Sequence, residues 1–192
     1  TSAVRVFGIG NGTAPSTSPA DAIQMWSADT VAGQANLYTR NENGKSEQIT
    51  GLADRVSTQF DKTDTTLAAV TGLSHDVEAG KAYAFEVILY TTSDVAAGIK
   101  ASVSGTATAT SIIYESLVMQ TGTTVATTAS RSTSLAGTVA NVTAVTVATI
   151  KIWGTIVVNA AGTLTPMFAQ NVDTGTSSVL VNSSFILKPK EN

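Results

Sequence analysis

A chain of 192 residues is long enough for one domain with an appendage or for two small domains. Charged residues make up only 13% of it, about half the usual share, and the net charge is −3. This composition disfavours nucleic acid as a partner and lacks the high net charge of a disordered chain. Cysteine is absent, so disulfides and thiolate metal sites are excluded. No apolar run approaches the roughly 18 residues that span a bilayer, so membrane insertion is not expected.

The first twenty residues form a Gly, Ser, Pro and Thr-rich segment in which Pro15 and Pro19 prevent helix formation. Residues 1–12 lack the charged and apolar regions of a signal peptide. The glycines at residues 8–12 do not match a dinucleotide-binding motif, because Thr13 stands where the last glycine is needed. We therefore predict that residues 1–20 are a flexible docking arm.

Residues 21–51 are expected to form a β-hairpin element. Asn43-Gly44 lies between two extended segments, and this pair is typical of a hairpin tip because both residues tolerate a positive φ. Residues 23–28 can supply a third strand. A ribbon of this size is not stable alone in water, so its apolar side chains need neighbours. The predicted oligomer interface consists of Ile23, Met25, Trp26, Leu37, Tyr38 and Ile49.

Residues 52–192 are rich in Thr and Val, and their apolar residues alternate with a period of two, which is typical of strands. The pattern predicts strands over residues 56–60, 67–73, 81–90, 99–103, 112–119, 150–158, 164–168 and 179–187. Pro166 interrupts the alternation and indicates an edge or a bulge. The residues predicted to face inward are Tyr83, Phe85, Val87, Leu89, Ile150, Ile152, Ile156, Val158, Leu164, Phe168, Val179, Val181, Phe185 and Leu187.

About eight strands in a segment of this length are typical of a β-sandwich or jelly roll. The Ala-rich stretches are too short to nucleate a helix. We therefore predict an all-β fold, in which the N-terminal arm and β-hairpin precede a jelly-roll-like antiparallel β-sandwich at residues 52–192.

Residues 21–29 (DAIQMWSAD) and 35–44 (ANLYTRNENG) together resemble a β-hairpin element of tailed-bacteriophage virion proteins. In that family three copies of the element intertwine into a trimeric stem. The runs at residues 77–86, 153–164 and 168–171 resemble the terminal β-sandwich of the fibres or capsid appendages of the same class. The likeness covers most of residues 21–190, and it depends on the order and spacing of motifs that are each an ordinary β pattern.

The resemblance implies a homotrimeric, non-enzymatic virion protein that is assembled in the host cytoplasm and displayed on the virion surface. Its partners would be two further copies of itself and, through the arm, other virion proteins. A tail or head fibre is favoured, and a capsid decoration protein that stabilises the head is the alternative. A further alternative is a free carbohydrate-binding module, for which a host-surface glycan is the candidate partner.

No residue pattern indicates a catalytic, cofactor or metal site. His75 is the single histidine, and its neighbours Ser74 and Asp76 point to the opposite face of a strand, so they cannot form a triad with it. The carboxylate pairs Asp61 with Asp64 and Glu78 with Glu86 are expected to be solvated rather than to hydrolyse sugars or to bind calcium. The Asn-x-Ser/Thr triplets at residues 11, 141 and 182 are expected by chance.

The two tryptophans have different expected roles. Trp26 lies in the hairpin element, where a subunit interface is favoured over a ligand site. Trp153 points away from Ile152 and Ile156 on its strand. It is expected to face a second core layer, a neighbouring subunit or a sugar, in that order of preference.

Overall fold

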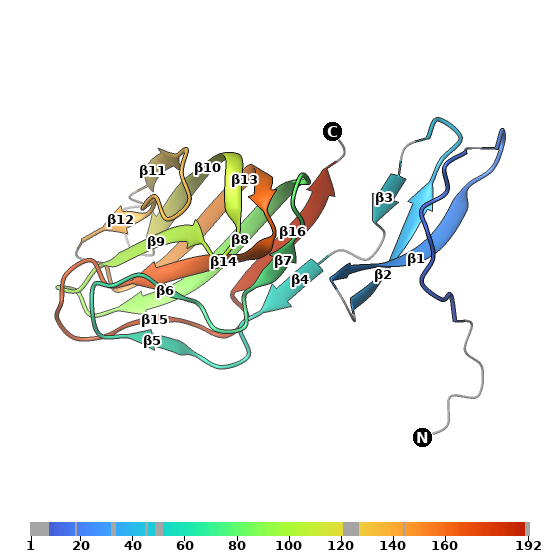
Figure 1. Cartoon of the computed structure of the whole chain (residues 1–192). Coiled ribbons are helices and arrows are strands. Elements are labelled where there is room, and N and C mark those ends of the chain that lie inside the picture. The colour runs from blue at the N-terminus through green and yellow to red at the C-terminus, as the bar shows by residue number, and fades with distance from the viewer. Residues whose placement is uncertain are drawn as a thin grey trace, which may run out of the picture. The chain divides into compact units, whose positions relative to one another are not determined.

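The structure is a computed structural model that describes residues 8–17, 19–31, 34–44, 46–48, 52–120, 127–143 and 145–190. The chain divides into two compact units, residues 1–51 and residues 52–190. All named strands pair antiparallel, and the described residues contain no helix (Figure 1). It follows that no helix among them is long and apolar enough to cross a membrane. The predicted all-β, antiparallel sandwich fold is confirmed.

The first unit contains a three-stranded sheet in the order β1-β2-β3, with β1 at Gln24–Val31, β2 at Gln34–Arg40 and β3 at Ser46–Gln48. The turn between β2 and β3 is closed by the Gly44 N–H, which donates to the Asn41 carbonyl at 3.0 Å. Gly44 has a φ of 82°, which a side chain would strain. The Asn-Gly pair therefore marks the hairpin that the sequence predicts.

Part of the predicted arm is ordered along β1. Asn11 forms a parallel bridge with Ser27, and the Gly12 N–H donates to the Ser27 carbonyl at 2.8 Å. The Asn11 side chain donates to Asp29 at 2.6 Å and accepts from the Ser27 hydroxyl at 3.0 Å. These bonds add a short fourth partner to the sheet edge, so flexibility is not a property of the whole arm. Residues 1–7 and 18 lie outside the described residues.

The second unit consists of two antiparallel sheets (Figure 1). The larger has eight strands, with β11-β10-β13-β8 in sequence and with β16 and β15 sharing the other side of β8. Its strands are β4 Leu52–Arg55, β5 Phe60–Lys62, β8 Ala82–Ser93, β10 Thr108–Gln120, β11 Thr127–Ser132, β13 Val147–Ala160, β15 Ser177–Val179 and β16 Ser184–Lys190. The smaller has β6 Ala68–Ala69, β7 His75–Val77, β9 Ile99–Ser104, β12 Asn141–Val142 and β14 Gly162–Ala169.

The hydrophobic core belongs to the second unit. Buried and accessible side chains alternate along β8 and β13, as their period-two pattern predicts. The predicted inward faces of both strands are confirmed, and each buried Val, Leu, Ile or Phe contributes about 1.5–3 kcal/mol of burial free energy. The largest fully buried apolar side chains are Leu73, Leu89, Ile99, Tyr114, Ile150, Ile152, Ile156, Leu164, Phe168, Phe185 and Leu187. None of the first unit's described residues joins this cluster.

The prediction of one continuous strand over residues 179–187 is wrong. The chain turns between β15 and β16, where the Ser183 N–H donates to the Leu180 carbonyl at 3.3 Å and Asn182 has a φ of 70°. Val181 lies on this turn and is exposed, although the sequence pattern places it in the core. Asparagine tolerates the left-handed conformation, so a turn can fall inside an apolar alternation without Gly or Pro.

Two further predicted strands are shorter than expected or displaced. Val56 is buried between β4 and β5, and its backbone exchanges hydrogen bonds with Ser183 and Asn182 of the turn rather than with a strand. In the segment 67–73 only β6 forms, because the chain then turns at Gly72, whose φ is 84°. Among its described residues the second unit has thirteen strands, several of them only two or three residues long, whereas about eight were expected.

Pro166 lies inside β14, which is paired on both sides, so it marks neither a sheet edge nor a bulge. On one side β14 pairs with β7 up to Leu164 and with β6 from Met167 onward. Pro166 falls in the gap between these two short partners, where no N–H is needed, and its carbonyl accepts from the Val70 N–H at 2.9 Å.

Candidate functional site

The six residues of the predicted oligomer interface do not share one face of the first unit. The register pairs Trp26 with Tyr38 and Ser27 with Leu37. Because side chains alternate along a strand, Trp26 and Tyr38 lie on one face while Met25 and Leu37 lie on the other. Ile23 precedes β1 in phase with Met25. Ile49 lies outside the described residues.

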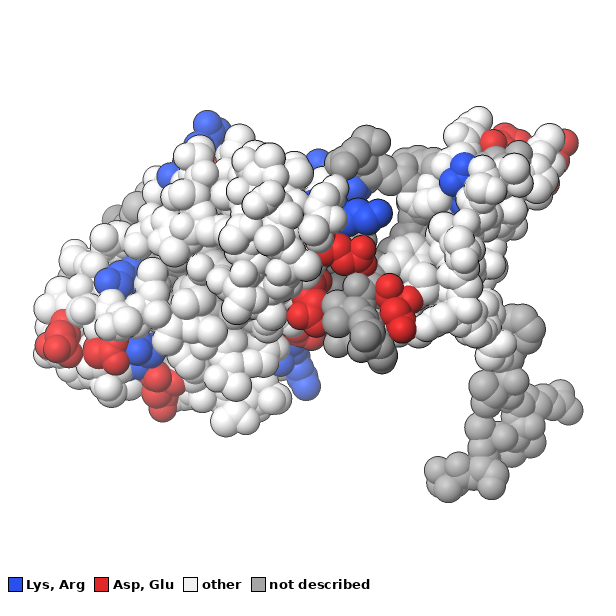
Figure 2. Space-filling view, viewed as in Figure 1, with Lys and Arg blue, Asp and Glu red and all other residues white. Residues whose placement is uncertain are grey.

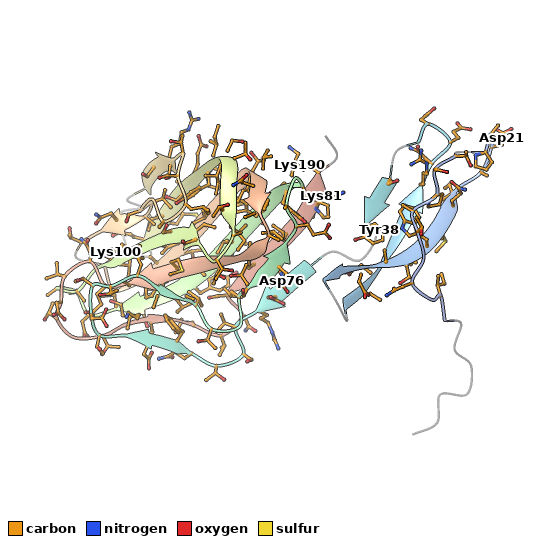
Figure 3. The ribbon with its side chains drawn as sticks, viewed as in Figure 1. Asp21, Tyr38, Asp76, Lys81, Lys100 and Lys190 are labelled. Carbon is orange, nitrogen blue, oxygen red and sulfur yellow. The ribbon has the colours of Figure 1, made fainter. Side chains whose placement is uncertain are left out.

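An aromatic pair, Trp26 and Tyr38, covers one face of the three-stranded sheet. The rings of Trp26 and Tyr38 stack with centroids 5.4 Å apart and an angle of 16° between their planes. Trp26 is 8% exposed, so its indole is covered within its own chain. Tyr38 lies on the three-stranded sheet (Figure 3) and is half-buried. These two side chains pack against each other within one chain and thereby stabilise the ribbon.

The opposite face, named here the Met25 face, consists of Ile23, Met25 and Leu37, of which Leu37 is half-buried and the other two are exposed. Ile23 is 72% exposed and Met25 is 54% exposed. The same face carries the polar edge where Asn11 bonds to Ser27 and Asp29. Large apolar side chains left in water on a ribbon that lacks a core are typical of an unoccupied protein contact.

His75 is the first residue of β7, and it is buried between the two sheets of the sandwich. Its Nδ1 lies 3.4 Å from the Asp54 carboxylate, and its Nε2 lies 3.2 Å from the Phe185 carbonyl. The imidazole also packs on the Phe185 ring at 4.6 Å. Ser74 instead pairs its hydroxyl with Thr165 at 3.0 Å. Both ring nitrogens thus face acceptors of the fold, and no hydroxyl of a described residue is bonded to the imidazole for activation.

The carboxylates of Asp61 and Asp64 accept hydrogen bonds from neighbouring groups. Asp61 accepts from the Ser178 hydroxyl and the Gln59 amide, both at 2.7 Å, and these bonds lower its pKa. Lys62 and the Thr66 N–H hold Asp64, whose pKa they lower as well. Among the described residues no group of three potential metal ligands gathers. Figure 2 shows a surface on which charged residues are sparse.

Trp153 faces outward, so the preferred expectation of a second core layer is wrong. It is 36% exposed on β13, in the middle of the larger sheet. Its cross-strand neighbours are Glu115 on β10 and Glu86 on β8. Arg131 donates to Glu115 at 2.8 Å, and Lys151 pairs with Glu86 at 2.8 Å. The indole therefore stands between two carboxylates that are each matched by a cation.

A shallow hollow of about 260 Å³ lies beside this row, where β8 runs next to β16. Ala84 and Ile186 form its apolar part, and Glu86 and Lys188 supply its charged groups. Sequence reasoning identified Trp153 but not this hollow. The period-two alternation places Trp153 and the residues of the hollow on the outward faces of their strands. Only the cross-strand register shows that β13, β8 and β16 lie next to one another.

Comparison with known proteins adds little to this geometry. No family model matches the chain, and no curated protein matches it. Among solved structures, the chain is similar to the structure of infectious bursal disease virus, strain Gt, with a TM-score of 0.18 and 11% identity. The alignment covers 83% of this chain, which spans about half (51%) of that chain's length.

Proposed function

We propose that this chain is a non-enzymatic structural protein of a tailed-bacteriophage virion, and that it forms a homotrimeric surface appendage through the ribbon of its first unit. The observation that carries the proposal is the exposed Met25 face on a sheet that contributes nothing to the hydrophobic core. The likeness of residues 21–44 to trimeric stem elements supports the symmetry.

Physical chemistry supports a partner for the ribbon. An isolated sheet of two or three short strands is marginal in water, because its apolar face is covered on one side only. Ile23 and Met25 each leave more than half of the side chain in water. Covering the exposed part stabilises by about 1–2 kcal/mol per side chain, so a trimer gains roughly 10 kcal/mol before the entropic cost of association.

The arm would attach the appendage to the rest of the virion. Asn11 anchors the described part of the arm, residues 8–17, to β1. Three arms presented by one trimer would bind other virion proteins with the gain of multivalency, since the second and third contacts become intramolecular. This role is common to a fibre and to a capsid decoration protein, and the ribbon favours the fibre.

The test is the mass of the full chain in solution. Sedimentation or mass photometry should give a trimer for the wild type. The double variant Ile23→Ser with Met25→Ser should shift it toward monomer without changing the circular dichroism of the sandwich. A monomeric wild type, or a double variant that stays trimeric, would refute the proposal.

The chain offers a matched control for surface polarity. Val172 and Val181 are also exposed apolar residues, at 46% and 47%, but they belong to loops of the second unit. Val172→Ser with Val181→Ser should leave the mass unchanged. Loss of the trimer in this control as well would show that the assembly does not depend on the ribbon.

A further inference from the structure

The outward face of the larger sheet carries an excess of positive charge. The register and the alternation of its strands place five basic and three acidic side chains there, while the whole chain carries −3. The basic residues are Arg55, Arg131, Lys151, Lys188 and Lys190, and the acidic ones are Asp61, Glu86 and Glu115. This face therefore attracts anions although the protein as a whole repels them.

The charges around the hollow are not balanced. Glu86 is already paired with Lys151 at 2.8 Å. Lys188 is exposed on β16 beside Ala84, and among the described residues no ion pair involves it. A ligand that enters the hollow therefore meets one cation whose charge is unmatched, and an acidic group on the ligand would match it.

The apolar parts of the site suit a ring with one non-polar face. Trp153 stands one strand from the hollow, across Glu86, so about 4.8 Å separates the two strands that carry them. The backbone that carries the indole is fixed, because β13 is paired on both sides along most of its length. Ala84 and Ile186 continue the apolar surface into the hollow. A sugar ring buries its C–H face against such groups while its hydroxyls stay available for hydrogen bonds.

We infer that this face binds an acidic glycan, with Trp153 as the stacking platform and Lys188 as the partner of the carboxylate. The Glu86–Lys151 and Glu115–Arg131 pairs supply acceptors and donors on both sides of the indole. A saccharide hydroxyl can bond to such groups without removing them from water. This site is independent of the proposed trimer, because every residue in it belongs to the second unit.

A protein partner fits the same face less well. Interface cores are depleted of charged residues, and two ion pairs beside the indole would lose their hydration under a flat protein contact. The hollow is open and small, about 260 Å³, so it offers a protein anchor side chain no enclosed pocket.

The experiment is calorimetric titration of the full chain with oligogalacturonate and with its carboxyl-reduced, neutral counterpart. Oligogalacturonate should bind at least about tenfold more tightly than the neutral sugar, and the difference should fall with added salt. Trp153→Ala should weaken binding of the acidic sugar about tenfold or more. Lys188→Gln should remove most of the preference for the acidic sugar.

The matched control is Lys100→Gln, which removes a cation from β9 of the smaller sheet (Figure 3). It should leave both affinities within about twofold, which is the effect of a distant surface charge. Equal binding of the two sugars, no binding of either, or an equal loss in the Lys100→Gln variant would overturn the inference. A change of oligomeric mass in Trp153→Ala would overturn it as well, because the face would then be a subunit contact.

Discussion

Gly154 is the position at which one added methyl group should disturb the sandwich most directly. It lies in the centre of β13, opposite Tyr114 on β10 and Phe85 on β8, whose rings approach at 6.2 Å. A Cβ built at this position would lie 2.4 Å from the Ile113 carbonyl oxygen and 2.5 Å from the Tyr114 Cβ. Its φ is not positive, so the constraint is one of space and not of backbone conformation.

The magnitude follows from these contacts. The two clashing atoms are a backbone oxygen and a Cβ of β10, neither of which can move by a side-chain rotation. Removing the clash therefore requires β10 and β13 to move apart by about 1 Å. Overpacking of this kind costs about 1–3 kcal/mol, and the reduced entropy of the unfolded chain on Gly→Ala offsets about 0.4–1 kcal/mol of it. We expect a net loss of about 1–2 kcal/mol, which lowers the Tm by roughly 3–8 °C for a domain of this size.

Urea unfolding, followed by circular dichroism and by Trp153 fluorescence, measures the loss. Thr155→Ala is the matched control, because Thr155 is an exposed residue on the same strand. Its free energy of unfolding should stay within about 0.5 kcal/mol of wild type. A Gly154→Ala variant as stable as that control would refute the reasoning that close strand approach requires glycine here.

Three further predictions concern the core, the loop end and the arm. Phe185→Ala, at a side chain that is fully buried, should cost about 3–5 kcal/mol in urea unfolding, and a loss below 1 kcal/mol would contradict its place in the core. Ser178→Ala should raise the pKa of Asp61 toward its ordinary value of 3.8 in an NMR titration. Because the pKa of Asp61 is lowered in the folded state, its stabilising effect is present above the unfolded pKa and is lost as the pH falls through the folded pKa, and the variant should weaken this acid-side loss. Asn11→Ala should speed hydrogen exchange of the Gly12 amide about tenfold, since about 1–1.5 kcal/mol of hydrogen bonding is removed, and unchanged exchange would show that the arm is held in another way.

Strand patterns that are long and regular were predicted correctly from the sequence. β8 and β13 bury the predicted residues because a strand with one face on a core must alternate. The hairpin at Asn43-Gly44 was also predicted correctly, because its turn depends on the conformational preferences of these two residues alone. The short strands were not, because Val56 and the residues after Val179 take their hydrogen bonds from distant segments.

The candidate sites follow the same division. The apolar residues of the ribbon were identified from the sequence, but which residues of β1 share a face with which residues of β2 depends on the register of the two strands. The stacking of Trp26 on Tyr38 is a consequence of that register. Trp153 was recognised as pointing away from Ile152, yet nothing local indicates whether that side meets another layer or water.

Composition and periodicity by themselves determined that the chain is an all-β protein with a hairpin before a sandwich, because alternation and turn chemistry act between near neighbours in the chain. The tertiary structure alone decided which strands lie side by side. This arrangement places Glu86 and Glu115 on either side of Trp153 and forms the hollow at Lys188. The physical reason is that strand pairing is a contact between residues far apart in sequence, and the free energy that selects one register comes from burying the whole core rather than from any single segment.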